Sequence, residues 1–101
     1  MPCQTMTNDA LYTLAIGQRY QKQAKKFFRQ HPDLRPAYDH LLADLVIDPF
    51  APVLKLHALS GRLKGAWVVS LTFSYRITLT LLVSEKEITL LEIGDHDDVY
   101  R

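Results

Sequence analysis

The hydrophobic period of this 101-residue chain changes once, near residue 50, and that change restricts the folds open to it. Between Gln18 and Asp48 the apolar residues recur at helical spacing, and from Val53 onward they alternate with polar residues. Helices followed by alternating strands are typical of an α+β fold, in which the helices cover one face of an antiparallel sheet. We therefore expect residues 1–101 to form one small domain of this class.

The first half of the chain predicts one strand and one helix before residue 31. A short apolar stretch from Asp9 to Ile16 ends at Gly17 and is expected to be the first strand. Residues 18–30 carry an apolar stripe at spacings of i, i+4, i+7 and i+8, which predicts a helix. The stripe consists of Tyr20, Ala24, Phe27 and Phe28.

A second helix is expected between two proline-containing breaks. Asp33 is a plausible N-cap, and Pro36 falls in the first turn, where no intrahelical donor is lost. Asp48-Pro49 ends the helix, because the residue before proline resists the α conformation. Its apolar stripe comprises Leu34, Tyr38, Leu41, Leu42, Leu45 and Val46.

Four further strands are expected over residues 53–59, 66–73, 75–81 and 87–93. Their alternation gives the sheet one apolar face, suited to the helices, and one polar face. The polar face is predicted to carry Lys55, His57, Ser70, Thr72, Arg76, Thr78 and Thr80. The predicted fold is therefore α+β, with two N-terminal helices packed on a mostly antiparallel sheet of four to five strands.

Composition indicates where in the cell the protein is expected to act. No apolar run approaches the ~20 residues that a membrane-spanning helix needs, and the N-terminus lacks the pattern of a signal peptide. The lone Cys3 excludes an internal disulfide, so we expect a reducing, cytoplasmic location and no membrane association.

The net charge of +1 is distributed unevenly. Residues 1–82 hold ten Lys or Arg against five Asp or Glu, whereas residues 83–101 hold two against six. The basic part of the chain could meet a polyanion, although ordinary surface charge explains the same distribution.

The basic residues of the first helix form one stripe. Arg19, Lys22, Lys26 and Arg29 follow a spacing of three, four and three residues, with no acidic residue between Ala10 and Pro32. Such a stripe could lie along a phosphate backbone. The alternative is the solvated polar face that any amphipathic helix requires.

The polar face and the strand end after residue 93 could support phosphodiester cleavage without a metal. Lys55, His57 and Arg76 can share the face, while His96 and Tyr100 follow the last strand. Attack of a ribose 2′-hydroxyl on its own phosphate needs a base, an acid and cations that hold the developing charge. Histidine can serve as base or acid near neutral pH, and arginine and lysine supply the cations.

Each of these residues also has a structural interpretation. His57 could be an exposed strand residue, Arg76 an ion-pair partner, His96 a turn residue held by neighbouring aspartates, and Tyr100 a C-terminal anchor. The tail sequence Asp95-His96-Asp97-Asp98 could suggest a metal site. Adjacent ligands in a tail rarely converge on one ion, so we expect neither a metal nor a cofactor.

Several motifs together resemble a known family. Leu-His-x-Leu-x-Gly-x-Leu-Lys-Gly-x-Trp begins at Leu56, Tyr-Arg-Ile follows at Tyr75, and Ile-x-x-His-x-x-x-Tyr begins at Ile93. This combination resembles the RelE/ParE superfamily of type II toxins, and within it the ribosome-dependent mRNA interferases of the RelE, YoeB and YafQ kind. The resemblance implies a toxin that cuts mRNA in the ribosomal A site, contacts ribosomal RNA and is neutralised by a cognate antitoxin.

The resemblance also implies roles for individual residues. His57 takes the position of the general base, Arg76 of the arginine that steadies the transition state, His96 of the general acid, and Tyr100 of the terminal aromatic that completes the site. The phosphate-binding cations implied by the resemblance are Lys55, Arg62 and Lys64.

Two other functions fit the same fold. ParE-like members inhibit DNA gyrase and lack the histidine pair, so His57 with His96 favours the nuclease. The other is a catalytically degenerate relative that only binds antitoxin. Ser70 and Ser74 stand where YafQ-like toxins carry further histidine and aspartate residues that contact the substrate.

Overall fold

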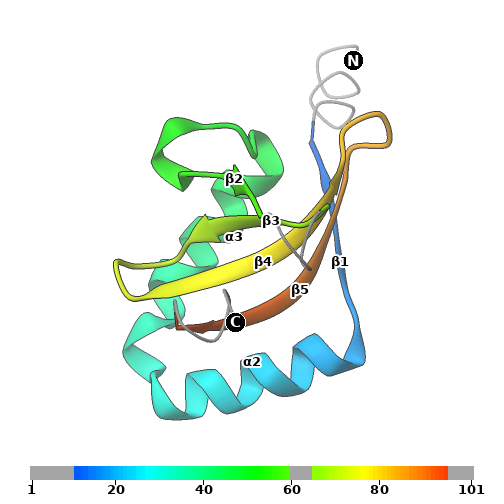
Figure 1. Ribbon diagram of the computed structural model, residues 1–101. Helices are drawn as coiled ribbons and strands as arrows, with labels where there is room; N and C mark the ends of the chain where they lie inside the picture. Colours follow the sequence, from blue (N-terminus) through cyan, green and yellow to red (C-terminus); the bar gives the residue numbers. More distant parts are fainter. Residues whose placement is uncertain (1–10, 60–64, 96–101) are drawn as a thin grey trace, which may run out of the picture.

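The computed structural model describes residues 11–59 and 65–95, and in these ranges two helices lie against one five-stranded sheet (Figure 1). The elements, in chain order, are β1 Thr13–Ile16, α2 Gln18–Gln30, the 3-10 turn η1 Pro32–Leu34, α3 Arg35–Ile47, the 3-10 turn η2 Pro52–Leu54, β2 His57–Ala58, β3 Trp67–Ser70, β4 Tyr75–Leu82 and β5 Glu87–Asp95. The α+β class and the two-helix layer predicted from the sequence are confirmed.

The sheet has the strand order β1-β5-β4-β3-β2 and is mixed. β1 runs parallel to β5, with Thr13 opposite Glu87, while β2, β3, β4 and β5 pair antiparallel in succession. The prediction of a mostly antiparallel sheet is therefore confirmed. The one parallel pair joins the first and the last strand of the chain, which are separated in sequence by both helices and by β2, β3 and β4.

Both helices pack on the same face of the sheet and enclose the core (Figure 1). α2 contributes Tyr20 and Phe27, and α3 contributes three buried residues, namely Tyr38, Leu41 and Leu45. The sheet supplies the buried residues Val69, Ile77, Leu79, Ile88, Leu90 and Ile93. Trp67 is partly buried against this core. Within the described ranges, neither helix has the length and apolarity needed to cross a bilayer.

The strand predicted over residues 53–59 is wrong for most of its length. Residues Pro52–Leu54 form the 3-10 turn η2, and the strand β2 contains only His57 and Ala58. Proline fixes its own φ near the helical value and favours the start of such a turn. Lys55 then adopts a left-handed conformation with φ of 53°, which reverses the chain before the strand. Alternation alone does not reveal this reversal, because the apolar residues still occur at every second position.

Other boundaries also differ from the sequence prediction, and the first strand, expected from Asp9, is Thr13–Ile16. β3 ends at Ser70, not at residue 73, and the chain bends before β4 begins at Tyr75. β5 extends two residues beyond the predicted end, to Asp95. Asp33 is not the N-cap of α3, because residues 32–34 form the turn η1 and Leu34 takes the cap position without a side-chain hydrogen bond. Pro36 does lie in the first turn of α3, as predicted.

The face of the sheet away from the helices is less polar than the alternation predicts. Leu59, Ala66 and Val68 form a second buried cluster, with Leu91 packed against it. A shift in register between Thr78 and Leu79 places Leu91 opposite no residue of β4. Thr78 is 2% exposed, so its predicted place on a solvated face is wrong. The open face therefore has an apolar centre, and its accessible polar residues lie toward the strand ends.

Candidate active site

His57 lies on the edge strand β2 with its side chain exposed. Its Nδ1 is 3.0 Å from the carbonyl oxygen of Lys55. A carbonyl oxygen only accepts hydrogen bonds, so Nδ1 carries the proton and donates it. The neutral imidazole then has its lone pair on Nε2, which is the arrangement a general base requires. The left-handed backbone of Lys55 turns that carbonyl toward the ring.

Arg76 lies near the start of β4, half-buried, at the end of the sheet next to the β3–β4 hairpin. Its Nη1 donates hydrogen bonds to three carbonyl oxygens of that hairpin, at 2.7 Å to Thr72, 3.0 Å to Phe73 and 3.2 Å to Tyr75. These contacts hold the bend between the two strands. The guanidinium carries five N–H donors, so Nε and Nη2 are the atoms that could face a ligand.

His57 and Arg76 lie on the same face of the sheet. His57 pairs with Val68 of β3, and Arg76 pairs with Ser70 two residues further along the same strand. Residues two apart in a strand point to one face, so the two side chains share the open face on either side of β3. Strand spacing and rise place their Cα atoms roughly 12 Å apart, a span that a histidine and an arginine could close around one phosphodiester.

The remaining catalytic residues of the prediction lie outside the described ranges, as do two of the phosphate-binding cations. These are His96, Tyr100, Arg62 and Lys64. Lys55 is described and exposed, next to His57 at the end of η2. Among residues 11–59 and 65–95, no three His, Cys, Asp or Glu side chains come together as a potential metal-binding group.

All four residues of the basic stripe of α2 are exposed. Arg19 makes an ion pair with Glu92 of β5 at 3.2 Å, although its side chain remains 83% exposed. Lys26 lines a cavity beside β5, whereas Arg29 lines a different cavity between α2 and α3. Lys22 borders a third hollow on the outer side of α2. The four residues thus border several hollows and one ion pair, and their role in phosphate binding stays a prediction.

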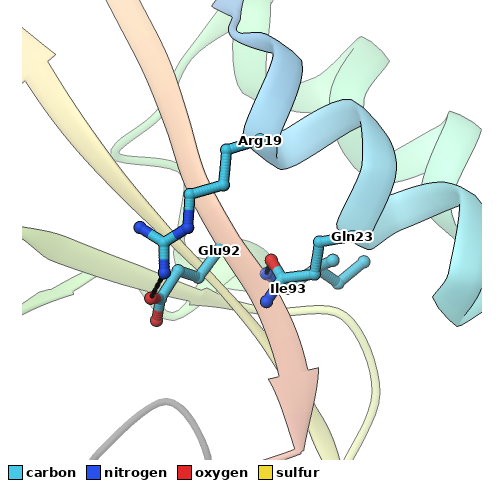
Figure 2. A network of polar contacts seen from close by, with 4 residues as sticks. All are labelled: Arg19, Gln23, Glu92 and Ile93. Atoms are coloured by element: carbon cyan, nitrogen blue, oxygen red, sulfur yellow. Dashed lines mark hydrogen bonds and ion pairs between the residues drawn. The ribbon is translucent and has the colours of Figure 1, made fainter.

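Gln23 of α2 covers part of the edge of the sheet. The Oε1 of Gln23 accepts a hydrogen bond from the backbone N–H of Ile93 at 2.7 Å, beside the Arg19–Glu92 pair (Figure 2). β1 pairs with β5 only as far as Leu90, so beyond that point β5 keeps β4 on one side and has no strand on the other. Gln23 replaces the missing strand at one position.

A cavity of ≈ 330 Å³ lies between the C-terminal half of α2 and the end of β5. Its lining includes Lys26, Gln30, His31 and Tyr75, together with Gly94 opposite Arg76 in the sheet. The sequence pattern does not mark Gln30 or His31 as site residues, because they follow the last apolar position of the helix. The signal that could have located them is Tyr75, which directly precedes Arg76 in the Tyr-Arg-Ile motif.

Comparison with solved structures identifies the fold. The structure of YafQ from E. coli strain BL21(DE3) superposes with a TM-score of 0.73 at 17% identity, covering 89% of this chain and 99% of that one. The chain has the RelE/ParE-type toxin fold. A YoeB/ParE toxin from Agrobacterium tumefaciens matches with a TM-score of 0.68 at 19% identity, covering 83% of this chain and 98% of that chain.

The RelE/ParE-type fold also occurs in a toxin bound to its partner. The E. coli DinJ–YafQ toxin–antitoxin complex matches with a TM-score of 0.72 at 19% identity, covering 90% of this chain and 99% of that one. No protein-family model and no curated protein sequence matches the chain. The family resemblance noted in the sequence is thus confirmed at the level of the fold.

Proposed function

We propose that this protein is the toxin of a type II toxin–antitoxin system and that it cleaves mRNA on the ribosome without a metal ion. The observation that supports the proposal is the placement of His57 and Arg76 on one open face of a RelE/ParE-type fold. The chain would act in the cytoplasm on mRNA in the A site, contact ribosomal RNA, and be neutralised by a cognate antitoxin.

The proposed reaction is an internal transfer within the RNA. Nε2 of His57 removes the proton from a ribose 2′-hydroxyl, and the 2′-oxygen forms a bond to the adjacent phosphorus. The bond from phosphorus to the 5′-oxygen breaks, and the leaving oxygen takes a proton from His96. The products are a 2′,3′-cyclic phosphate and a 5′-hydroxyl end. Nε and Nη2 of Arg76 would stabilise the charge that develops on the phosphate oxygens.

The hydrogen bond between His57 and Lys55 supports this assignment. It fixes the tautomer in which Nε2 accepts the proton, and it limits rotation of the ring. Lys55 itself brings a positive charge next to the base, where a phosphate would bind. Tyr100, Arg62 and Lys64 would complete the site from the segments that follow β2 and β5.

The proposal is tested with an mRNA that carries a single 2′-deoxynucleotide at a mapped cleavage site, presented on programmed ribosomes. Without the 2′-hydroxyl the nucleophile is absent, so cleavage at that position should stop while other sites are still cut. The unmodified mRNA should yield cyclic phosphate ends. Persistent cleavage at the deoxy position, or 3′-hydroxyl products, would contradict the reaction, because a water molecule would then be the nucleophile.

Variants of two exposed histidines test the base. His57→Ala should reduce the cleavage rate by roughly 10²–10⁴, the usual contribution of a positioned proton acceptor. His40→Ala is the matched control, since His40 is an exposed histidine on α3 that pairs with Asp44. His96→Ala and Arg76→Ala should also relieve growth arrest while antitoxin binding is retained. Equal activity of His57→Ala and His40→Ala would exclude the assigned base.

A further inference from the structure

One side of α2 follows the free edge of β5, and its residues are used in two different ways. Arg19, Gln23, Lys26 and Gln30 occupy this side at helical spacing. The first two bind the strand directly, through Glu92 and the N–H of Ile93 (Figure 2). The last two line the ≈ 330 Å³ cavity opposite Gly94 and Asp95. The same helix face therefore contacts β5 through its N-terminal residues and lines a cavity through its C-terminal residues.

Aromatic rings form the inner wall of this cavity. Phe27, His31 and Tyr75 lie in mutual contact, with ring centroids 4.7 Å apart for Phe27–His31, 4.9 Å for His31–Tyr75 and 5.1 Å for Phe27–Tyr75. Phe27 is 8% exposed and belongs to the core. His31 and Tyr75 are only half-buried, so their rings are the part of the cluster that a ligand can reach.

The cavity lies at the same end of the sheet as Arg76. Tyr75 pairs with Asp95 and Arg76 pairs with Gly94, so adjacent residues of β4 contribute to the cavity and to the candidate site. Successive strand residues point to opposite faces. An RNA strand held at Arg76 could therefore place a neighbouring nucleotide around the end of β4 and β5.

We propose that this cavity is a subsite for one nucleotide of the RNA substrate, with its base against His31 and Tyr75 and its phosphate at Lys26. The inference rests on the proposed function and adds a position where the substrate is recognised. Stacking on aromatic rings is the common way in which proteins hold unpaired bases. The amide of Gln30 can both donate to and accept from the edge of a base.

A nucleotide uses the aromatic wall, the cation and the amide of this space. An apolar ligand would leave Lys26 and Gln30 without a role, and a simple anion would not use the aromatic wall. The cavity volume lies at the lower end of the range for small-ligand sites, which suits a single nucleotide. Lys26 is exposed, so the phosphate contact would lie at the solvent side and be weakened by salt.

Titration of the full chain with the four nucleoside 5′-monophosphates, followed by two-dimensional NMR, tests the subsite directly. Saturable shifts are expected at the amides of Lys26, Gln30, His31 and Gly94. His31→Ala should weaken binding about 10-fold through loss of a stacking surface. His40→Ala should leave the affinity unchanged. Shifts spread over all basic residues, or none at the cavity, would overturn the proposal.

Variants of two adjacent lysines distinguish nucleotide binding at the subsite from general electrostatic attraction to the helix. Lys26→Gln should weaken binding several-fold at low salt, and the difference should shrink as salt is added. Lys25→Gln removes the same charge one residue away, on the side of α2 that lines the cavity facing α3. The Lys25→Gln variant should bind nucleotides with nearly the wild-type affinity. Equal losses in both variants would show that only the net charge of the helix matters.

The test also separates this inference from the proposed nuclease function. Nucleotide binding at the cavity in a protein that cuts no mRNA would retain the subsite and reject the nuclease. Conversely, if Lys26→Gln and His31→Ala cleave the same mRNA positions at the wild-type rate and bind nucleotides unchanged, the subsite is rejected while the nuclease stands.

Discussion

At the scale of single residues, Arg76 illustrates how one side chain can serve both the fold and the site. The sequence predicts it as a cation for the transition state, and its position on the open face is compatible with that role. The structure adds three hydrogen bonds from its Nη1 to the carbonyls of the β3–β4 hairpin. Removing the side chain therefore changes the hairpin as well as the charge, and loss of activity alone would not separate the two.

Arg76→Ala is expected to reduce the free energy of unfolding by about 2 kcal/mol, because the partly buried carbonyl groups of Thr72 and Tyr75 lose a charged donor. Arg19→Ala should cost no more than about 1 kcal/mol, since the ion pair of Arg19 with Glu92 is largely exposed to solvent. Urea unfolding of both variants provides the comparison. A stability of Arg76→Ala equal to that of the wild type would show that the hairpin does not depend on the guanidinium.

At the scale of the elements, two polar contacts besides the exposed Arg19–Glu92 ion pair connect α2 to its neighbours. Gln23 binds the exposed edge of β5, and the hydroxyl groups of Tyr20 and Tyr38 form a buried hydrogen bond of 3.0 Å between α2 and α3. Both contacts join residues far apart in the sequence. The period of the apolar residues identifies the helix faces that pack, but it does not identify these polar partners.

Gln23→Ala should lower the free energy of unfolding by about 1–2 kcal/mol, because the N–H of Ile93 loses its acceptor in a partly buried place. Hydrogen exchange of the Ile93 amide should accelerate at the same time. Gln21→Ala is the matched control, because Gln21 is exposed on the same helix and should change stability by less than about 0.5 kcal/mol. Unchanged exchange at Ile93 would contradict the edge contact.

The tyrosine pair predicts a loss of stability at high pH. Burial, together with the hydrogen bond to Tyr38, raises the pKa of Tyr20 above its usual value near 10. The unfolded chain therefore loses this proton first, so the contribution is present at neutral pH and declines as pH rises above about 10, by up to about 1.4 kcal/mol per pH unit.

Tyr20→Phe isolates this effect. At pH 8 the variant should be less stable than the wild type by about 1 kcal/mol, because Tyr38 loses its partner. Above pH 10 the difference should shrink and then reverse, since phenylalanine does not ionise. Urea unfolding curves between pH 8 and pH 11 measure the difference, and a constant value across that range would exclude a buried phenol.

At the scale of the whole molecule, the sequence predicted the arrangement of layers better than the details of the site. The change of period near residue 50 specified both helices and the mainly antiparallel sheet, because burial of apolar side chains determines them. It did not reveal the turn at Pro52–Leu54 or the left-handed Lys55, which local backbone preferences produce.

The site was predictable only in part for a related reason. His57 and Arg76 could be placed on one face from alternation along β3 and β4. The cavity near His31 depends instead on how α2 crosses the end of β5, which alternation within a strand does not encode. The apolar centre of the open face depends on the bulge at Leu91, which the alternation of residues in the sequence does not predict either.

The central claim is that the molecule cuts mRNA during translation. Mapping of mRNA 5′-ends within minutes of brief induction, without antitoxin, tests it most directly. We predict discrete new 5′-hydroxyl ends inside translated reading frames, in a fixed position relative to the codon, and their absence from the His57→Ala strain. Intact mRNA with altered DNA supercoiling would instead indicate a gyrase inhibitor, and intact mRNA with normal growth would indicate a protein that only binds antitoxin. Either result would contradict the account.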